Sequence, residues 1–193
     1  MSTETRNVDL VGDEVVGNVA RAALLAALTG AFAYVTFPNP VSPTSVTLQV
    51  LGVFLAGLLL GPVWGGISMV LYLAAGAVGA PVFLGGSAGF GNLVGTTAGY
   101  LWSYPIAAFA IGLVAYGRLD TNADLNAGLP RLALALTVGT VIIYALGVVG
   151  LMLIGGLGLE AAVVGGALTF IPAEALKAVV AVGVVRSGAI ATS

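Results

Sequence analysis

The chain has 193 residues, of which 59% are hydrophobic and only 7% are charged, and its formal net charge is −2. Soluble domains carry about 25% charged residues, so this composition excludes a soluble protein. With neither Cys nor His, the sequence also excludes thiol chemistry, Fe–S clusters, His-ligated zinc and Ser-His-Asp triads, and we expect no metal site. The net negative charge argues against nucleic acid as a partner.

Apolar runs predict six transmembrane helices, one partial helix and no second domain. A spanning helix needs about 20 mostly apolar residues. The predicted spans cover residues 19–37, 46–60, 64–78, 97–116, 132–154 and 173–185. Gly61-Pro62 predicts a tight turn between the second and third spans. Residues 159–170 are apolar but short and interrupted by glycine, so we expect a partial or re-entrant helix there.

The expected organisation is an all-α polytopic membrane protein with one six-helix transmembrane domain, residues 19–187. A polar N-terminal tail, residues 1–18, precedes this domain, and a short C-terminal tail, residues 188–193, follows it. With six spans, both tails, the turn at 61–63 and the loop at 117–131 lie on one side of the membrane.

The arginines predict which side this is. All of them fall in or next to the segments of that side: Arg6, Arg21, Arg118, Arg131 and Arg186. The three other connections contain neither Lys nor Arg, so the positive-inside rule predicts that both termini are cytoplasmic. The expected location is the cell (plasma) membrane, with several passes through the lipid bilayer.

The three connections on the opposite side are irregular in sequence. They are the Pro/Ser-rich link at 38–45, the glycine-rich stretch at 79–95 and the segment at 155–172. Irregular backbone at membrane depth is tolerated where it is buried in protein or lines a cavity. Together above the start of the last span, these connections predict a lidded cavity that opens to the outside.

Glu174 and Lys177 place an acid and a base inside an otherwise uncharged apolar run, and Lys177 is the only lysine. Pro172 suits the first turn of a helix, and residues three apart emerge on one helix face. Each buried charge costs about 2.5–3.5 kcal/mol in a membrane helix. The pair either neutralises itself and fixes helix packing, or it forms a polar site for a solute, which we favour.

The glycine-rich loop at 85–100 contains Phe90, Gly91, Asn92 and Tyr100. It lacks the Gly-Lys-Ser/Thr of a phosphate loop and the spacing of the dinucleotide fingerprint. Glycine allows the backbone to approach a ligand or another helix, and the aromatic and amide side chains offer stacking and hydrogen bonds. A merely flexible loop is the alternative.

Small residues recur through the first span at the spacing of close helix–helix contacts. They are Ala22, Ala23, Ala26, Ala27, Gly30 and Ala31. This stripe suits either internal packing or a partner surface. Thr47 and Gln49, near the outer end of the second span, suit either the membrane interface or a ligand.

Taken together, five stretches resemble the BioY family, the biotin-specific substrate-binding (S) component of energy-coupling-factor (ECF) transporters. They are residues 43–51, 55–62 and 73–83, the glycine-rich loop at 85–100, and residues 170–177, which correspond to a Pro-Gly-Asp-x-x-Lys element. The resemblance runs in order from about residue 20 to 186, with the same six spans. The combination of motifs is far more specific than any one of them.

The resemblance implies a membrane subunit that captures biotin from outside with high affinity, a transporter rather than an enzyme. In such systems the S component docks on a transmembrane coupling protein driven by two ATPases, and the whole subunit is thought to topple to release the vitamin. The docking residues implied here are Ala22, Ala23, Ala26, Ala27 and Ala31. The chain has no nucleotide site, so ATP belongs to the partner subunits, biotin is a substrate and no cofactor is expected. Some members are reported to work without dedicated partners.

Biotin carries a ureido group, an apolar bicycle and a carboxylate on a flexible chain. Glu174 offers an acceptor to the ureido N–H groups, and Lys177 offers a donor to an oxygen. The resemblance and this chemistry make Asn92, Gly91, Phe90 and Tyr100 further ligand-binding candidates, with Trp102 as an additional apolar wall.

Two departures from the family pattern concern the pocket. Glu174 and Ala173 stand where the family has aspartate and glycine, and residues 95–100 differ from the usual Gly-Pro-Thr-Gly-Gly-Tyr. Three alternatives stay open: the same architecture carrying another vitamin, a small intramembrane enzyme with Glu174 as general base, and a purely structural assembly subunit.

Overall fold

The computed structural model describes residues 12–39, 42, 45–119 and 125–188, so most of both predicted tails lies outside the described residues. Its helices are α1 (Asp13–Phe32), α2 (Gln49–Ala77), α3 (Ala98–Tyr116), α4 (Leu129–Leu153), α5 (Leu159–Gly166) and α6 (Ile171–Arg186). Short 3₁₀ turns are η1 (Leu84–Gly86), η2 (Phe90–Leu93) and η3 (Leu168–Phe170). Five helical stretches of the described chain are long and apolar enough to cross a membrane, as expected for a membrane protein.

The long helix α2 turns back on itself at Gly61, as the sequence predicts. Gly61 has a φ of 71°, a conformation that glycine adopts without strain, and Pro62 follows it. A Cβ added to Gly65 would lie only 2.8 Å from the carbonyl oxygen of Ala56. In a straight helix these two residues would be about 13 Å apart. The two halves of α2 therefore pack side by side, and they correspond to the predicted second and third spans.

The fold is all-α as expected, and the described chain also contains a short two-stranded antiparallel sheet that was not predicted, β1 (Thr36–Phe37) and β2 (Val46–Thr47). This pairing ends the first helix at Phe32, five residues before the predicted end, and delays the start of α2 to Gln49. β-branched and aromatic residues favour extended backbone, which explains why these span ends leave the helix. Helix α1 also begins at Asp13, six residues earlier than predicted.

The other predicted elements agree closely with the structure. Helix α3 begins one residue late, and α4 begins three residues early because Pro130 is tolerated in a first helical turn. The partial helix predicted at 159–170 is α5 followed by η3. Helix α6 includes Pro172 in its first turn, where the ring was expected.

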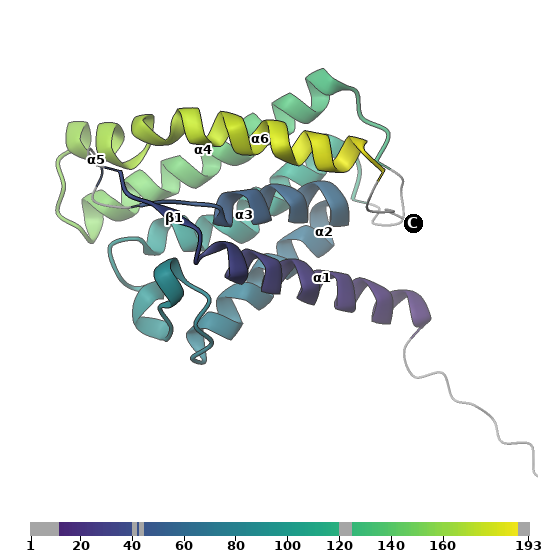
Figure 1. Cartoon of the computed structure of the whole chain (residues 1–193), viewed down its shortest axis with the longest axis horizontal. Helices are drawn as coiled ribbons and strands as arrows, with labels where there is room; N and C mark the ends of the chain where they lie inside the picture. Colours follow the sequence, from purple (N-terminus) through teal and green to yellow (C-terminus); the bar gives the residue numbers. More distant parts are fainter. Residues whose placement is uncertain (1–11, 40–41, 43–44, 120–124, 189–193) are drawn as a thin grey trace, which may run out of the picture.

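Helix α2 forms the centre of the bundle and packs against α1, α3 and α6, while α4 packs against α3 (Figure 1). Side chains on all faces of the first half of α2, residues 49–62, are buried, including Val53, Phe54 and Leu58. A helix that is apolar all round is expected in such a central position.

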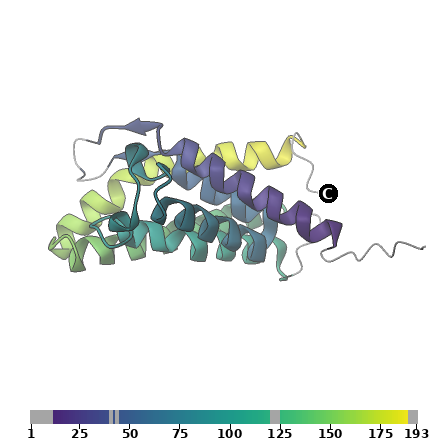
Figure 2. The same ribbon diagram turned by 90° about the horizontal axis from the view of Figure 1, so that it is seen from below.

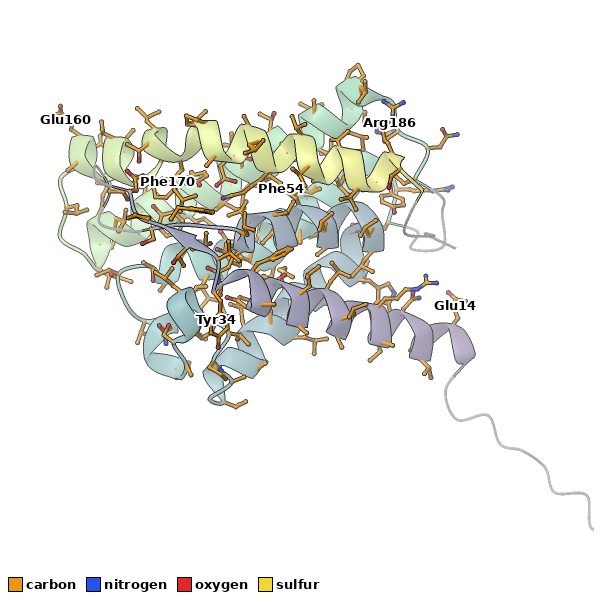
Figure 3. All side chains as sticks on the ribbon, in the orientation of Figure 1. Glu14, Tyr34, Phe54, Glu160, Phe170 and Arg186 are labelled. Atoms are coloured by element: carbon orange, nitrogen blue, oxygen red, sulfur yellow. The ribbon has the colours of Figure 1, made fainter. Side chains whose placement is uncertain are left out.

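The two ends of the bundle differ in character. The starts of α1 and α4 and the end of α6 lie at one end, and the β1–β2 sheet and α5 lie at the other (Figures 1 and 2). In Figure 3, Glu14 and Arg186 mark the first end and Glu160 marks the second. Arg186 at the end of α6 and Arg131 at the start of α4 therefore lie at the same end, and Arg131 bonds there to the end of α3.

Candidate binding site

A cavity lies at the end of the bundle that carries the irregular connections. It contains about 620 Å³ of space between atoms, part of which belongs to its open mouth. Ser45 and Thr47 from the first connection, Phe83 and Asn92 from the second, and Phe170 from the third all line it. The cavity expected beneath three connections is therefore present.

The charged pair at the start of α6 forms part of the cavity wall. Lys177 Nζ donates to Glu174 Oε1 at 2.6 Å, and the two residues are only 5% and 3% exposed. Pro172 in the first turn sets the start of α6, and the three-residue spacing brings both side chains to one face. The pair expected from the sequence is formed, and it is buried.

Tyr144 of α4 contacts the same carboxylate oxygen, since its hydroxyl donates to Glu174 Oε1 at 2.8 Å. The second oxygen, Glu174 Oε2, is buried and has no hydrogen-bond partner among the described residues. Buried carboxylate oxygens without a partner are costly, so this atom is an acceptor suited to an N–H donor of a ligand. An ammonium carries three N–H groups, and the bond to Glu174 uses one of those on Lys177.

A second polar wall comes from the start of α2. The Gln49 side chain is buried and donates from Nε2 to the Tyr72 hydroxyl, which in turn donates to the Val82 carbonyl at 3.0 Å. Thr47 Oγ1 donates to Gln49 Oε1 at 3.1 Å. These bonds tie the cavity wall to both neighbouring connections, and both Thr47 and Gln49 line the cavity.

Aromatic rings form most of the remaining wall. The ring of Tyr144 lies 6.0 Å from that of Tyr100 and 5.7 Å from that of Phe170, measured between centroids. Phe83 and Tyr104 also line the cavity and are buried. Edge-to-face and tilted pairs at these separations are favourable and hold the rings in place. The wall therefore suits a flat apolar group bound beside the charged pair.

The cavity brings together four of the six predicted ligand residues, Glu174, Lys177, Asn92 and Tyr100. Phe90 is 61% exposed, and neither it nor Gly91 lines this cavity. Their contact with a ligand remains a prediction without support from the cavity, and Phe83 and Phe170 take the place of the expected Phe90 wall.

The loop uses part of the predicted hydrogen-bonding capacity itself. Asn92 Nδ2 donates to the Ala88 carbonyl at 3.0 Å, and its Oδ1 accepts from Ser87 Oγ at 3.0 Å. The Trp102 ring is 51% exposed and donates to the Leu93 carbonyl at 2.9 Å. Asn92 therefore holds the glycine-rich loop in shape as well as facing the cavity.

The cavity residues that sequence reasoning missed include Tyr144, Tyr104, Phe83 and Phe170. The signal available for the tyrosines was a hydroxyl in the middle of an apolar span, which needs a partner in the membrane. Phe83 carried no such signal, because its place in the wall follows from the fold of the 79–95 connection.

The small residues of α1 divide between two faces. Ala22 and Ala26 are buried against the rest of the fold, and the Ala22 carbonyl accepts from Ser68 Oγ of α2 at 2.8 Å. Ala23, Ala27 and Ala31 are exposed. Ala22 and Ala26 already pack inside the protein, so only Ala23, Ala27 and Ala31 of the predicted docking residues are accessible to a partner. Docking itself stays a prediction.

Comparison with known proteins gives a consistent result. The model of the BioY family matches residues 2–192. A probable biotin transporter BioY of Pyrococcus horikoshii is 38% identical over 164 residues, which cover 85% of this chain and 91% of the relative. The biotin transporter BioY of Rhodobacter capsulatus is 38% identical over 74% of this chain and 73% of its own.

A solved structure gives the same answer for the fold. The crystal structure of the S-component for biotin from an ECF-type ABC transporter superimposes with a TM-score of 0.80 at 27% sequence identity. The match covers 92% of this chain and 93% of the other. This chain is therefore a membrane protein with the S-component fold, and it belongs to the BioY family.

Proposed function

We propose that this protein is a high-affinity biotin-binding subunit that mediates biotin uptake across the cell membrane. The observation that carries the proposal is the buried Glu174–Lys177 pair in the wall of an aromatic cavity. The family relationship supports the same substrate, because the relatives are named biotin transporters and the matching structure is an S-component for biotin.

The chemistry of the cavity matches that of biotin. Glu174 Oε2 accepts a hydrogen bond from a ureido N–H, and Lys177 donates to a ureido or carboxylate oxygen. The rings of Tyr100, Tyr104 and Phe83 contact the apolar bicycle. Glutamate in place of the family's aspartate keeps the charge on a longer side chain.

The assembly is the second part of the proposal. The protein docks on an ECF transmembrane coupling protein that works with two ATPases, and Ala23, Ala27 and Ala31 of α1 contribute to the docking surface. Exposed small residues at this spacing allow close helix contact in lipid. ATP is bound and hydrolysed on the partners, and both termini lie in the cytoplasm, as the arginines at one end of the bundle suggest.

Other functions are less well supported. Another vitamin in the same architecture is the nearest alternative, and binding selectivity separates it from biotin. An enzyme that uses Glu174 as general base, or a purely structural subunit, disagrees with a family whose members are named transporters.

Calorimetric titration of the detergent-purified protein with biotin, thiamine and riboflavin tests the proposal. We expect saturable binding of biotin alone in the nanomolar range. Binding of another vitamin in place of biotin would show that biotin is not the substrate. Any vitamin retained from purification is removed first, so that binding of none of the three would contradict the proposed function.

A further inference from the structure

A second hollow runs along the outside of the bundle between α4 and α6. It contains about 1260 Å³ of space, part of it open to the surroundings. Helix α6 packs mainly against α2 and has few contacts with α4, which leaves the groove between them. Its lining includes Ala133 and Val141 of α4 and Ala175, Ala178 and Val179 of α6. Most of this lining is apolar.

The groove offers almost no hydrogen bonds to an occupant. Its two hydroxyl groups are already used, since Thr137 Oγ1 donates to the Ala133 carbonyl at 2.9 Å and Thr140 Oγ1 donates to the Leu136 carbonyl at 2.8 Å. The remaining polar residue is Glu174, which lines the groove from the side of the cavity. Such a lining favours a long apolar group as the occupant.

The length of the groove matches one leaflet of a bilayer. Its lining on α6 extends from Ile171 to Val182, which is about 16 Å along a helix. Half the hydrocarbon thickness of a typical membrane is about 15 Å. The groove therefore accommodates the part of a lipid chain that crosses a single leaflet.

The charges at one end of the groove show which headgroup would suit it. Arg186 follows four residues after Val182, a lining residue of α6, and so lies on the same face of that helix. Arg131, near the start of α4, instead donates from Nε to the Val114 carbonyl of α3 at 2.7 Å. Both arginines are exposed. Glu14 lies at the same end of the bundle, but Figure 3 shows it well separated from Arg186, on α1.

We propose that the α4–α6 groove binds one acyl chain of an anionic membrane phospholipid, whose phosphate lies near Arg186. A cation at a membrane surface attracts anionic headgroups, and the groove supplies the matching apolar contact. The lipid chain covers the groove side of Glu174, so that the carboxylate meets hydrocarbon on one side and the cavity on the other. This proposal goes beyond biotin binding and does not depend on which solute occupies the cavity.

Native mass spectrometry of the detergent-solubilised protein tests the proposal, with phosphatidylglycerol and phosphatidylcholine of identical acyl chains as probes. We expect the wild-type protein to retain phosphatidylglycerol preferentially. Arg186→Gln should reduce that preference about fivefold, the value for one cation near an anionic surface. Arg21→Gln, which removes a charge from α1 on the far side of α2, should leave the preference unchanged.

A second pair of variants tests the apolar groove itself. Ala178→Phe places a ring in the groove and should reduce retention of both lipids at least fivefold, whereas Val180→Phe, outside the lining on the same helix, should not. Biotin titration checks that each variant is folded. If Ala178→Phe does not fold, the Arg186→Gln result alone decides the test, because Arg186 is exposed and its replacement should not disturb folding. Equal retention by Arg186→Gln and Arg21→Gln, or a dimer that excludes lipid from the groove, would overturn the proposal.

Discussion

The cavity at the start of α6 and the groove between α4 and α6 share Glu174 but are lined by side chains of opposite kinds. The cavity wall contains Tyr144 and Lys177, which both donate to Glu174. It also contains Gln49, which belongs to a separate buried hydrogen-bond network with Tyr72. The groove wall is apolar, and its hydroxyls are bonded to their own helix. Volume alone would rank the groove as the larger site, so the placement of hydrogen-bonding groups distinguishes a solute site from a lipid-facing surface.

Breaking the charged pair has the largest expected effect on biotin binding in the cavity. We expect Lys177→Met to weaken biotin binding about 30-fold or more, since truncating one partner of a buried charge pair costs about 2–5 kcal/mol. We expect this variant still to fold. Calorimetric titration measures the loss, and biotin binding at wild-type affinity would show that the pair is not the site.

The double variant Glu174→Gln with Lys177→Met separates binding from stability. Removing both charges leaves no unpaired ion in the membrane, so the thermal unfolding temperature should exceed that of Lys177→Met alone. Biotin affinity should stay as low as in the single variant. Recovery of affinity together with stability would assign the pair a packing role only.

Removing the hydroxyl of Tyr144 should have the next largest effect. Tyr144→Phe deletes the hydrogen bond to Glu174 Oε1, and bonds to charged groups contribute about 1.5–3 kcal/mol. We expect biotin affinity to fall about tenfold. Tyr116→Phe is the matched control, because its hydroxyl donates to the Leu58 carbonyl at the other end of α2's first half. An equal loss in both variants would point to stability rather than to the site.

A glycine substitution tests the packing behind the aromatic wall. A Cβ on Gly76 would overlap the ring of Phe83, which lines the cavity, whereas a Cβ on Gly183 has open space. Gly76→Ala should lower stability by about 1–3 kcal/mol, the usual cost of overpacking, and weaken biotin binding severalfold. Gly183→Ala should do neither. Thermal unfolding and titration of the two variants check this, and identical behaviour would contradict it.

The smallest effect is expected in the groove. Thr140→Val removes a hydroxyl that is bonded to its own helix, so biotin affinity should change less than twofold. Thr47→Val removes the bond to Gln49 in the cavity wall and should weaken binding more, by about fivefold for one neutral hydrogen bond. Titration of both variants compares the two hollows directly, and a larger loss from Thr140→Val would reverse their assignment.

The elements with strong local signals were predictable from the sequence. Gly61-Pro62 identified the turn in α2, and Pro172 with the spacing of Glu174 and Lys177 identified a charged helix start. The positions of the arginines indicated which helix ends lie at the same end of the bundle. These features depend on backbone chemistry or on the cost of charge in lipid, both of which act over a few residues.

The residues that sequence reasoning missed depend on contacts between distant parts of the chain. Tyr144 reaches Glu174 across 30 residues, and the β1–β2 pairing joins Thr36 to Thr47. Phe90 was expected at the ligand because it is aromatic and lies in the glycine-rich loop, but the loop turns its ring outward. Side-chain direction in irregular backbone follows from tertiary contacts, which the local sequence does not specify.

The most direct test of the central claim is a structure of the protein purified with bound biotin. We predict density for the bicycle in the cavity, with a ureido nitrogen within hydrogen-bond distance of Glu174 Oε2 and an oxygen of the ligand within the same distance of Lys177 Nζ. Biotin density in the α4–α6 groove, or in the cavity without contact to either charged residue, would contradict the account.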